Sequence, residues 1–354
     1  TAYPYSSVDC TFTNAKQNSK TPVLIVPGIL GTEINKGDKK LWLDLGRNFT
    51  DIGDEFMDPL QFTGNLTPTD TSLTIGDVVR KANAGLGLVN FDYTLGLLQE
   101  FENQGYGDGT SATSTLFTFP YDWRYGVSGV FSDGKTNVDA LKQKIADIRS
   151  QTGSDKVDVV AHSTGGLLVK KYVMDNPTDN HIGKAVFVGV PNLGAPKAVK
   201  TLLQGDNFGI PFLADNEIKK IAANFPVAYD LLPSQTYFNQ IGSFVRVISS
   251  DNILQPIKDL NYDQTKSFLL TDHGLNSSAL SGAENLHTAT FDAYDPRSAG
   301  VDTYNIVGCK SGTLGAFYEN RLNGTTEATG DYRSSMSFLV WLNSSSRPPI
   351  VVRA

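Results

Sequence analysis

The segment from Val157 to Gly166 constrains the fold of this chain most, because it joins an apolar run to a serine flanked by small residues. It reads Val-Asp-Val-Val-Ala-His-Ser-Thr-Gly-Gly, with Ala161 two positions before Ser163 and Gly165 two positions after it. A sharp turn from a strand into a helix is crowded, so its flanking positions carry little or no side chain. The pattern predicts a nucleophile elbow with Ser163 at the edge of a parallel sheet, which indicates acyl-group hydrolysis or transfer. The alternative is a buried turn with an incidental serine.

The segments around this turn alternate between helical and extended patterns. Residues 157–160 and 184–190 are short, β-branched apolar runs, typical of strands that are covered on both faces. Residues 138–148 carry one apolar stripe at helical spacing, and residues 167–173 repeat that spacing after the serine. The predicted fold class is therefore α/β, with a doubly wound and mostly parallel sheet.

An early glycine-rich turn supports the same chemistry. The predicted strand Val23–Pro27 is followed by Gly28-Ile29-Leu30-Gly31-Thr32. A turn in this place can supply one backbone N–H to the negative oxygen of a tetrahedral intermediate, and Thr164, directly after the serine, supplies the second. Each such donor is worth about 3 kcal/mol of stabilisation. By itself the segment favours an ordinary Pro-Gly turn, but its pairing with the Ser163 motif favours an oxyanion hole.

A third segment lies between these two motifs. Residues 120–124 read Pro-Tyr-Asp-Trp-Arg, residues 231–234 read Leu-Leu-Pro-Ser, and residues 301–308 are a predicted late strand. The order and spacing of these segments resemble the lecithin:cholesterol acyltransferase-like family of α/β hydrolases. The resemblance extends from about residue 22 to residue 308.

This resemblance implies an α/β-hydrolase fold and action on ester bonds of lipids, as a lipase or carboxylesterase. An acyltransferase or a phospholipase of the same family would use the same residues. The resemblance implies that Ser163 is the nucleophile, that Leu30 and Thr164 supply the oxyanion hole, and that Trp123 lies near the acyl site. The neighbours of Trp123, Asp122 and Arg124, are expected to form a local ion pair that holds their turn together.

The histidine and the acid of a catalytic triad are harder to place. A serine hydrolase of this fold needs them after the serine, in the order Ser, acid, His. The four histidines are His162, His181, His273 and His287, and none of them follows residues 301–308. The resemblance implies a Gly-Asp-x-Thr-Val-Pro-like segment beyond that strand. Gly330-Asp331 stands at that distance without the Thr-Val-Pro part, which makes Asp331 the candidate acid.

Two other readings of this gap remain open. Asp251, at the end of the predicted strand 244–251, would restore the order Ser, acid, His together with His273 or His287. Alternatively, the chain is an ester- or lipid-binding pseudoenzyme, or a fragment, that keeps the serine and lacks the base. Residues 336–354 show no resemblance to the family, which fits the second reading.

We expect a single α/β-hydrolase domain over residues 1–354 with two inserts. One insert, at about 37–76, follows the glycine-rich turn and is lid-like. The other, at about 196–300, is rich in aromatic and aliphatic residues and is expected to form a cap. Caps exclude water and hold apolar acyl chains, and exposed apolar residues on a lid or cap would contact a lipid surface. Ordinary core packing is expected to account for most of these residues.

Composition narrows the choice of partners. Lys and Arg total 30 against 37 Asp and Glu, for a net charge of −7, which argues against nucleic acid or an anionic membrane as an electrostatic partner. No apolar run approaches the ~18 residues of a membrane-spanning helix. No metal or other cofactor is expected, because the Cys and His residues lack metal-ligand spacing.

The remaining expectations concern processing and assembly. We expect a secreted monomer, and Thr1 in place of an initiator methionine suggests a processed form. Cys10 and Cys309 form either one disulfide or two buried thiols. Asn-x-Ser/Thr sequons matter only in a glycosylating pathway. They begin at Asn48, Asn65, Asn276, Asn323 and Asn343.

Overall fold

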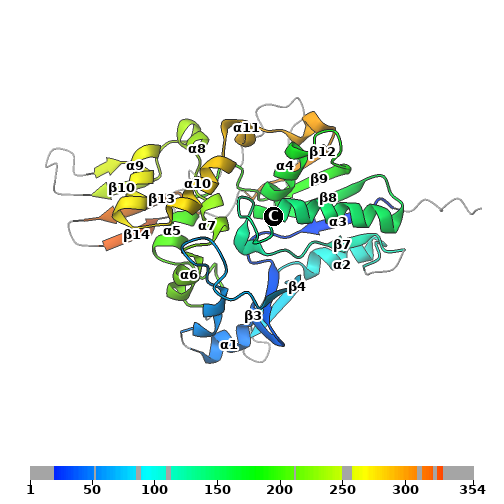
Figure 1. Cartoon of the computed structure of the whole chain (residues 1–354), viewed down its shortest axis with the longest axis horizontal. Coiled ribbons are helices and arrows are strands. Elements are labelled where there is room, and N and C mark those ends of the chain that lie inside the picture. Colours follow the sequence, from blue (N-terminus) through cyan, green and yellow to red (C-terminus); the bar gives the residue numbers. More distant parts are fainter. Residues whose placement is uncertain are drawn as a thin grey trace, which may run out of the picture.

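The structure is a computed structural model that describes residues 20–51, 53–84, 89–108, 113–210, 213–248, 257–308, 313–321 and 325–329. Its centre is a five-stranded parallel sheet in the order β12-β9-β8-β1-β7 (Figure 1). The strands are β1 (Val23–Val26), β7 (Leu116–Thr118), β8 (Val157–His162), β9 (Ile182–Val188) and β12 (Asp302–Ile306). The predicted α/β class with a parallel sheet is confirmed.

Helices cover both faces of this sheet, which explains why the central strand β1 is apolar and buried at every position. Successive strand residues point to opposite faces. Val23 and Ile25 of β1 pack with Leu98 of α2 (Leu95–Asn103), whereas Leu24 and Val26 belong to the main core. That core also takes the buried faces of α3 (Asn137–Thr152) and α4 (Thr164–Asp175).

Helix α3 forms where the apolar stripe predicts it. Thr136 and Asp139 make a reciprocal capping box at its start, and Gly153 ends it in the left-handed region at φ 68°. The stripe residues Leu141, Ile145 and Ile148 are buried. The helix thereby leads directly into β8 and the serine.

The first insert folds as a small antiparallel unit below the main sheet in Figure 1. It has a sheet in the order β3-β2-β4, and a further two-stranded sheet follows in the chain. Trp42 and Phe62 are buried in the main core, so these aromatic residues of the insert are structural. The elements are β2 (Thr32–Lys36), β3 (Lys39–Trp42), α1 (Leu45–Thr50), η1 (Glu55–Leu60), β4 (Leu73–Val78), β5 (Lys81–Ala84) and β6 (Val89–Asp92).

The second insert is mainly helical and lies beside the main sheet (Figure 1). Its helical segments are α5 (Lys197–Leu203), α6 (Asp215–Ala222), α7 (Pro226–Asp230), α8 (Gln235–Gln240), α9 (Tyr262–Ser267), η4 (Phe268–Asp272), α10 (Ser277–Leu286), α11 (Ala289–Asp292) and η5 (Pro296–Ala299). No helix among the described residues combines the length and the apolar character that crossing a membrane requires.

A second sheet extends this insert and contains the strand predicted at 244–251. The strand predicted at 244–251 forms as β10 (Val245–Ile248), but in a separate sheet of order β11-β10-β13-β14. Its partners are β11 (Ile257–Asp259) and, from beyond β12, β13 (Ala316–Asn320) and β14 (Thr325–Thr329). Because β10 does not join the sheet that carries Ser163, it does not end at the same sheet edge as the serine.

Candidate active site

Ser163 stands at a strained turn between β8 and α4. Its backbone lies at φ 51° and ψ −125°, a region that residues other than glycine rarely adopt. The Ser163 N–H donates to the Val188 carbonyl at 2.9 Å, and the Gly166 N–H donates to the Ser163 carbonyl at the same distance. The strand, turn and helix therefore hold the serine backbone from both sides, with the geometry that the A-x-S-x-G pattern predicts.

Close packing explains the glycines around the serine. A Cβ on Gly28 would lie 2.8 Å from the Ser163 Cβ, and a Cβ on Gly165 would lie 2.4 Å from the Pro27 carbonyl oxygen. On Gly166 it would meet Val190 Cγ2 at 2.1 Å. These separations are below van der Waals contact, so the glycine-rich turn and the serine turn fit together only without side chains at these positions.

Of the two predicted oxyanion-hole residues, Leu30 belongs to the glycine-rich turn after β1 and Thr164 directly follows Ser163. Leu30 has φ 67°, and its carbonyl accepts a 2.7 Å hydrogen bond from Trp42 Nε1, which fixes the orientation of the turn. Thr164 is the first residue of α4 and is fully buried. The first N–H groups of a helix have no acceptor within the helix and favour a negative partner. The role of both N–H groups as oxyanion donors stays a prediction.

Trp123 belongs to η3 (Trp123–Tyr125), a tightly held turn. Its indole donates to the Thr32 carbonyl at 3.0 Å and packs edge-on against Trp42, with ring centroids 5.7 Å apart. Next to it, Arg124 Nη2 lies 2.6 Å from Asp122 Oδ2, and only 3% of the Arg124 side chain is exposed. The expected local ion pair is confirmed, and it fixes the position of the neighbouring indole.

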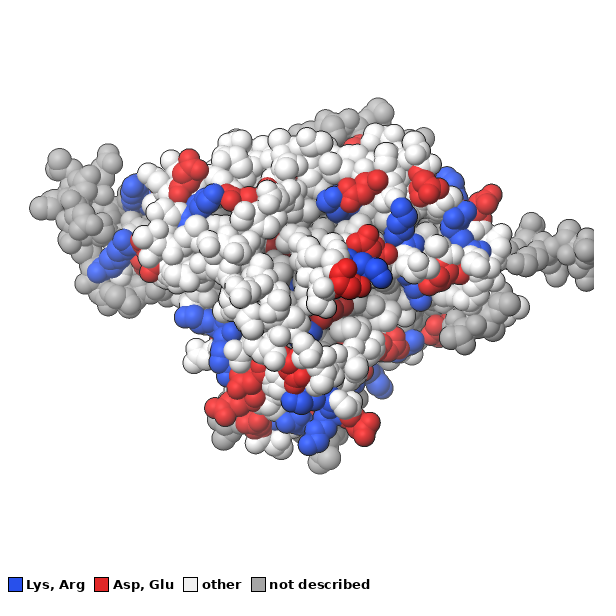
Figure 2. All heavy atoms as spheres, viewed as in Figure 1, with Lys and Arg blue, Asp and Glu red and all other residues white. Residues whose placement is uncertain are grey.

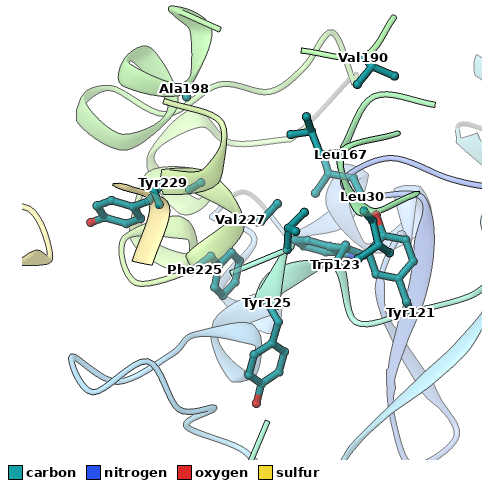
Figure 3. Packing of buried hydrophobic residues seen from close by; sticks show 14 of the residues in the cluster. Leu30, Tyr121, Trp123, Tyr125, Leu167, Val190, Ala198, Phe225, Val227 and Tyr229 are labelled. Carbon is teal, nitrogen blue, oxygen red and sulfur yellow. The ribbon is translucent and has the colours of Figure 1, made fainter. Parts of the chain in front are cut away.

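Ser163, Leu30 and Trp123 line one cavity of about 260 Å³. Among the described residues, Thr201 and Lys197 are the polar side chains that line it besides the serine and the indole. Figure 3 shows Val227 and Phe225 close to Trp123, with Tyr229 directed away from them. The apolar wall is formed mainly by Ile29, Pro191, Ala195, Ala198, Phe208, Ile218, Ile221, Ala222, Phe225, Val227, Ala228 and Leu231.

The first insert supports this wall from outside. Residues 37–76 supply none of the described residues that line the cavity. They contact the cap instead: Asp54 Oδ2 accepts the Ala214 N–H at 2.7 Å, and Lys220 Nζ lies 2.5 Å from Asp58 Oδ1. Phe62 packs against Phe225 with ring centroids 5.2 Å apart. The described residues of the first insert thus pack against the second insert and are not among those that line the cavity with Ser163.

His273 and His287, the two histidines that follow β9 in the chain, form hydrogen bonds outside the cavity. His287 Nδ1 lies 2.7 Å from Asp292 Oδ1, and His287 Nε2 lies 2.8 Å from the Asp230 carbonyl oxygen. His273 Nε2 lies 2.7 Å from Glu319 Oε2. Neither histidine is among the described residues that line the cavity. The geometry therefore gives no support to a triad built from His273 or His287.

Several predicted residues lie outside the described part of the chain. Asp331, the candidate acid, falls in residues 330–354, and Asp251 falls in residues 249–256. Cys10 and Cys309 are also outside the described residues.

The surface carries charges of both signs. In the view of Figure 2, acidic and basic side chains are interspersed, without a large field of one sign. Within the described ranges, no three His, Cys, Asp or Glu side chains gather as metal ligands would.

Reasoning from sequence missed part of the cavity. The aromatic and aliphatic richness of 196–300 pointed to a cap, but not to the small residues Ala195, Ala198 and Ala228 that make room beside the serine. Alanines have no distinctive pattern in a sequence. The hydrogen bond from the His287 ring to the Asp230 carbonyl was missed as well, because Asp230 lies 57 positions away.

The sequence of this chain is similar to known proteins. The family model described as lecithin:cholesterol acyltransferase matches residues 92–291. The phosphatidylcholine-sterol acyltransferase of Gallus gallus is 26% identical over 233 residues, which cover 57% of this chain and 54% of that protein. The lysosomal phospholipase A and acyltransferase of Bos taurus is 26% identical over 275 residues, which cover 69% of this chain and 65% of that protein.

A solved structure supports the fold alone. A chain in the crystal structure of the Tle4-Tli4 complex has a TM-score of 0.53 and 14% sequence identity, with 95% of this chain and 92% of that chain covered. The chain spans between about half and two thirds of the length of the two curated relatives above. Because the family model matches more than half of its residues, this chain belongs to the lecithin:cholesterol acyltransferase family.

Proposed function

We propose that this protein acts on carboxylic esters of lipids through an acyl-enzyme on Ser163, by hydrolysis or by acyl transfer. The observation that carries this proposal is the strained Ser163 turn, which opens into an apolar cavity of about 260 Å³. The names of the relatives support it, since a sterol acyltransferase and a phospholipase A with acyltransferase activity both move acyl groups of lipids.

The proposed reaction follows from the positions of these groups. Ser163 Oγ attacks the ester carbonyl and gives up its proton to a base. The carbonyl oxygen becomes negative and accepts hydrogen bonds from the N–H groups of Leu30 and Thr164. The alcohol then leaves with a proton, and the acyl group remains on Ser163. Water releases a carboxylic acid, whereas an acceptor alcohol yields a new ester. We retain Asp331 as the proposed acid that orients the base.

The apolar cavity supports the proposal of lipid substrates. An acyl chain beside Trp123 and the α7 wall would leave water for an apolar surface, a gain of about 0.8 kcal/mol for each buried methylene group. The proposed partner is therefore a lipid or another acyl ester, reached at a lipid interface through the cap. We further propose that the protein works as a secreted monomer.

A specific observation favours a second candidate function. The rings of His273 and His287 bind Glu319, Asp292 and Asp230, and no histidine is among the described residues that line the cavity. A protein with this cavity and no base would bind acyl esters without cleaving them. The alternative is therefore an ester-binding pseudoenzyme.

Turnover of p-nitrophenyl esters from acetyl to palmitoyl tests the proposal, with Ser163→Ala as the blank. We expect the substitution to reduce turnover by about 10⁴-fold or more, because the nucleophile is lost. The circular dichroism spectrum and the melting temperature should stay the same, because the serine is small. Equal turnover by both proteins would disprove the role of Ser163, and a folded wild-type protein without turnover would favour the binding function.

Product analysis separates hydrolysis from transfer. With an added long-chain alcohol, a hydrolase releases only the fatty acid, whereas a transferase also forms the new ester. The same reaction with Ser163→Ala controls for uncatalysed exchange.

A further inference from the structure

A buried group of ionisable residues lies behind the cavity wall, on α7, α10 and α11. It consists of Asp230, His287 and Asp292, called here the α7 anchor. His287 has 4% of its side chain exposed and Asp292 has 0%. The His287–Asp292 hydrogen bond is 2.7 Å long, and the ring also binds the Asp230 carbonyl at 2.8 Å. The proposed reaction does not use this group, so its burial needs another explanation.

Both partners of the His287 ring are acceptors. A main-chain carbonyl can only accept, and a carboxylate has no proton to give. Each ring nitrogen of His287 therefore has an acceptor within hydrogen-bond distance, and both contacts are hydrogen bonds when the ring donates from Nδ1 and from Nε2. Burial alone would raise the pKa of Asp292, but the hydrogen bond from His287 and the charge of His287 lower it overall. The carboxylate is thus held ionised next to the ring.

The other charged groups around His287 come from five elements. They are Asp230 of α7, Asp292 of α11, Glu284 of α10 with its ion-pair partner Lys266 of α9, and Lys170 of α4. Lys170 Nζ donates to the Asp292 carbonyl at 3.1 Å and lies 4.6 Å from the Phe291 ring centre. Burial lowers the pKa of Lys170 to about 8. The anchor therefore connects the helix that follows Ser163 to the far side of α7.

From α7 the connection continues to the turn that carries Trp123. The Asp230 carboxylate accepts the Val127 N–H at 2.7 Å and the Ser128 N–H at 3.1 Å. A Cβ on Gly126 would lie 2.3 Å from the same carboxylate oxygen, so this approach requires glycine. The anchor thus binds α7 from one side while Val227 and Ala228, on the same short helix, line the cavity.

We propose that His287 is a positioning residue: by donating to both Asp292 and the Asp230 carbonyl, it sets where α7 stands and so how far the acyl cavity extends beside Ser163. The cavity's role as an acyl site rests on the function proposed above. The substrate class that we expect this wall to select is the long-chain acyl group, because a longer chain fills more of the cavity that Val227 and Ala228 of α7 line.

Binding of a neutral fluorescent probe tests this inference without relying on turnover. The probes are dansyl amides with an N-dodecyl or an N-butyl chain, titrated into the wild-type protein and into His287→Gln. Glutamine is neutral and cannot donate to both acceptors with the geometry of the ring. We expect the substitution to weaken dodecyl binding about tenfold and butyl binding less than twofold. A role in stability alone would lower the melting temperature and leave the ratio of the two affinities unchanged.

The chain offers a matched control. His181 forms a similar pair with Asp179 at 2.7 Å, but 30% of its side chain is exposed and it lies in the loop before β9. His181→Gln should change neither affinity. If His287→Gln does not fold, Asp292→Asn removes the charge of the other partner and should give the same selective loss.

Two measurements decide between the possible failures. A wild-type protein that is folded but binds neither probe would disprove both the acyl site and this inference. Wild-type binding with equal dodecyl affinity in His287→Gln would disprove this inference alone. Independently, ¹H–¹⁵N spectra of the imidazole rings, assigned with His287→Gln, should show a proton on both ring nitrogens of His287. A ring with a proton on only one nitrogen would overturn the inference.

Discussion

The turn that carries Ser163 packs directly against the glycine-rich turn after β1, with almost no side chain between them. The cavity wall at α7 differs, because side chains from distant parts of the chain hold this short helix. Gly28 and Gly165 allow the two turns of the main sheet to touch without room for a methyl group. Helix α7 instead depends on the hydrogen bonds of Asp230 and on the contact of Phe225 with Trp123 and Phe62. The difference suggests that the turn tolerates no change of shape, while the wall can change shape and alter selectivity.

A methyl group added in the turn should have the largest effect on stability. For Gly165→Ala we expect a loss of about 3 kcal/mol or more and loss of turnover, because the new Cβ would lie 2.4 Å from the Pro27 carbonyl oxygen. Chemical denaturation measures the change. The matched control is Gly282→Ala in α10, where the new Cβ would be 3.4 Å from the nearest atom. At Gly282 the same change should stabilise the helix by about 0.5–1 kcal/mol. Equal losses of unfolding free energy at Gly165 and Gly282 would show that the serine turn is no more sensitive than an ordinary helix.

Truncation of the wall should affect stability less and selectivity more. Phe225→Ala should cost about 3 kcal/mol and shift the preferred acyl chain toward longer or bulkier esters, because it enlarges the cavity next to Trp123. Denaturation and the chain-length profile of ester turnover or probe binding measure the two effects.

Leu98→Ala is the control for this prediction. Leu98 is buried on the other face of the main sheet with Val23 and Ile25, away from the cavity. Its truncation should cost a similar 2–3 kcal/mol and leave the chain-length profile unchanged. A shifted profile in Leu98→Ala would show that selectivity follows overall stability and not the wall.

The smallest expected effect is a dependence of the free energy of unfolding on pH, caused by Glu217 in the second insert. Burial raises the pKa of Glu217 on α6 to about 7, although Lys220 pairs with it and opposes the shift. Because the folded state binds this proton more tightly than the unfolded state, the free energy of unfolding should fall as pH rises from about 4.5 to 7 and then level off. Glu217→Gln should reduce that fall by about 1–2 kcal/mol.

Denaturation at several pH values measures this slope. Glu100→Gln on α2, at an exposed position, is the control and should leave the slope unchanged. A slope in Glu217→Gln equal to that of the wild-type protein would show that another group causes it.

The main sheet and its serine turn could be predicted from the sequence in some detail. The runs at 23–27, 157–160 and 184–190 form β1, β8 and β9, and the stripe at 138–148 lies within α3. The sequence also predicted the Asp122–Arg124 ion pair, whose partners are two positions apart. These features depend on residues that are close in sequence, where periodicity and small side chains leave few alternatives.

The cap could be predicted only as an apolar insert. The strand at 244–251 was recognised, but its sheet was not, because β10 pairs with β13 from beyond the last strand of the main sheet. A triad through His273 or His287 was an open reading, and the structure gives both rings other partners. Hydrogen bonds between residues far apart in the chain leave no periodic pattern that a sequence could display.

The sequence by itself determined that a serine would stand at a glycine-lined turn above a parallel sheet, and its motifs indicated the family. Only the tertiary structure decided that α5, α6 and α7 close a cavity beside that serine and that the first insert supports them from outside. It also decided that His287 holds α7 from behind. The physical reason is range: steric limits at a turn act between neighbours, whereas the shape of a cavity depends on which distant segments pack around it.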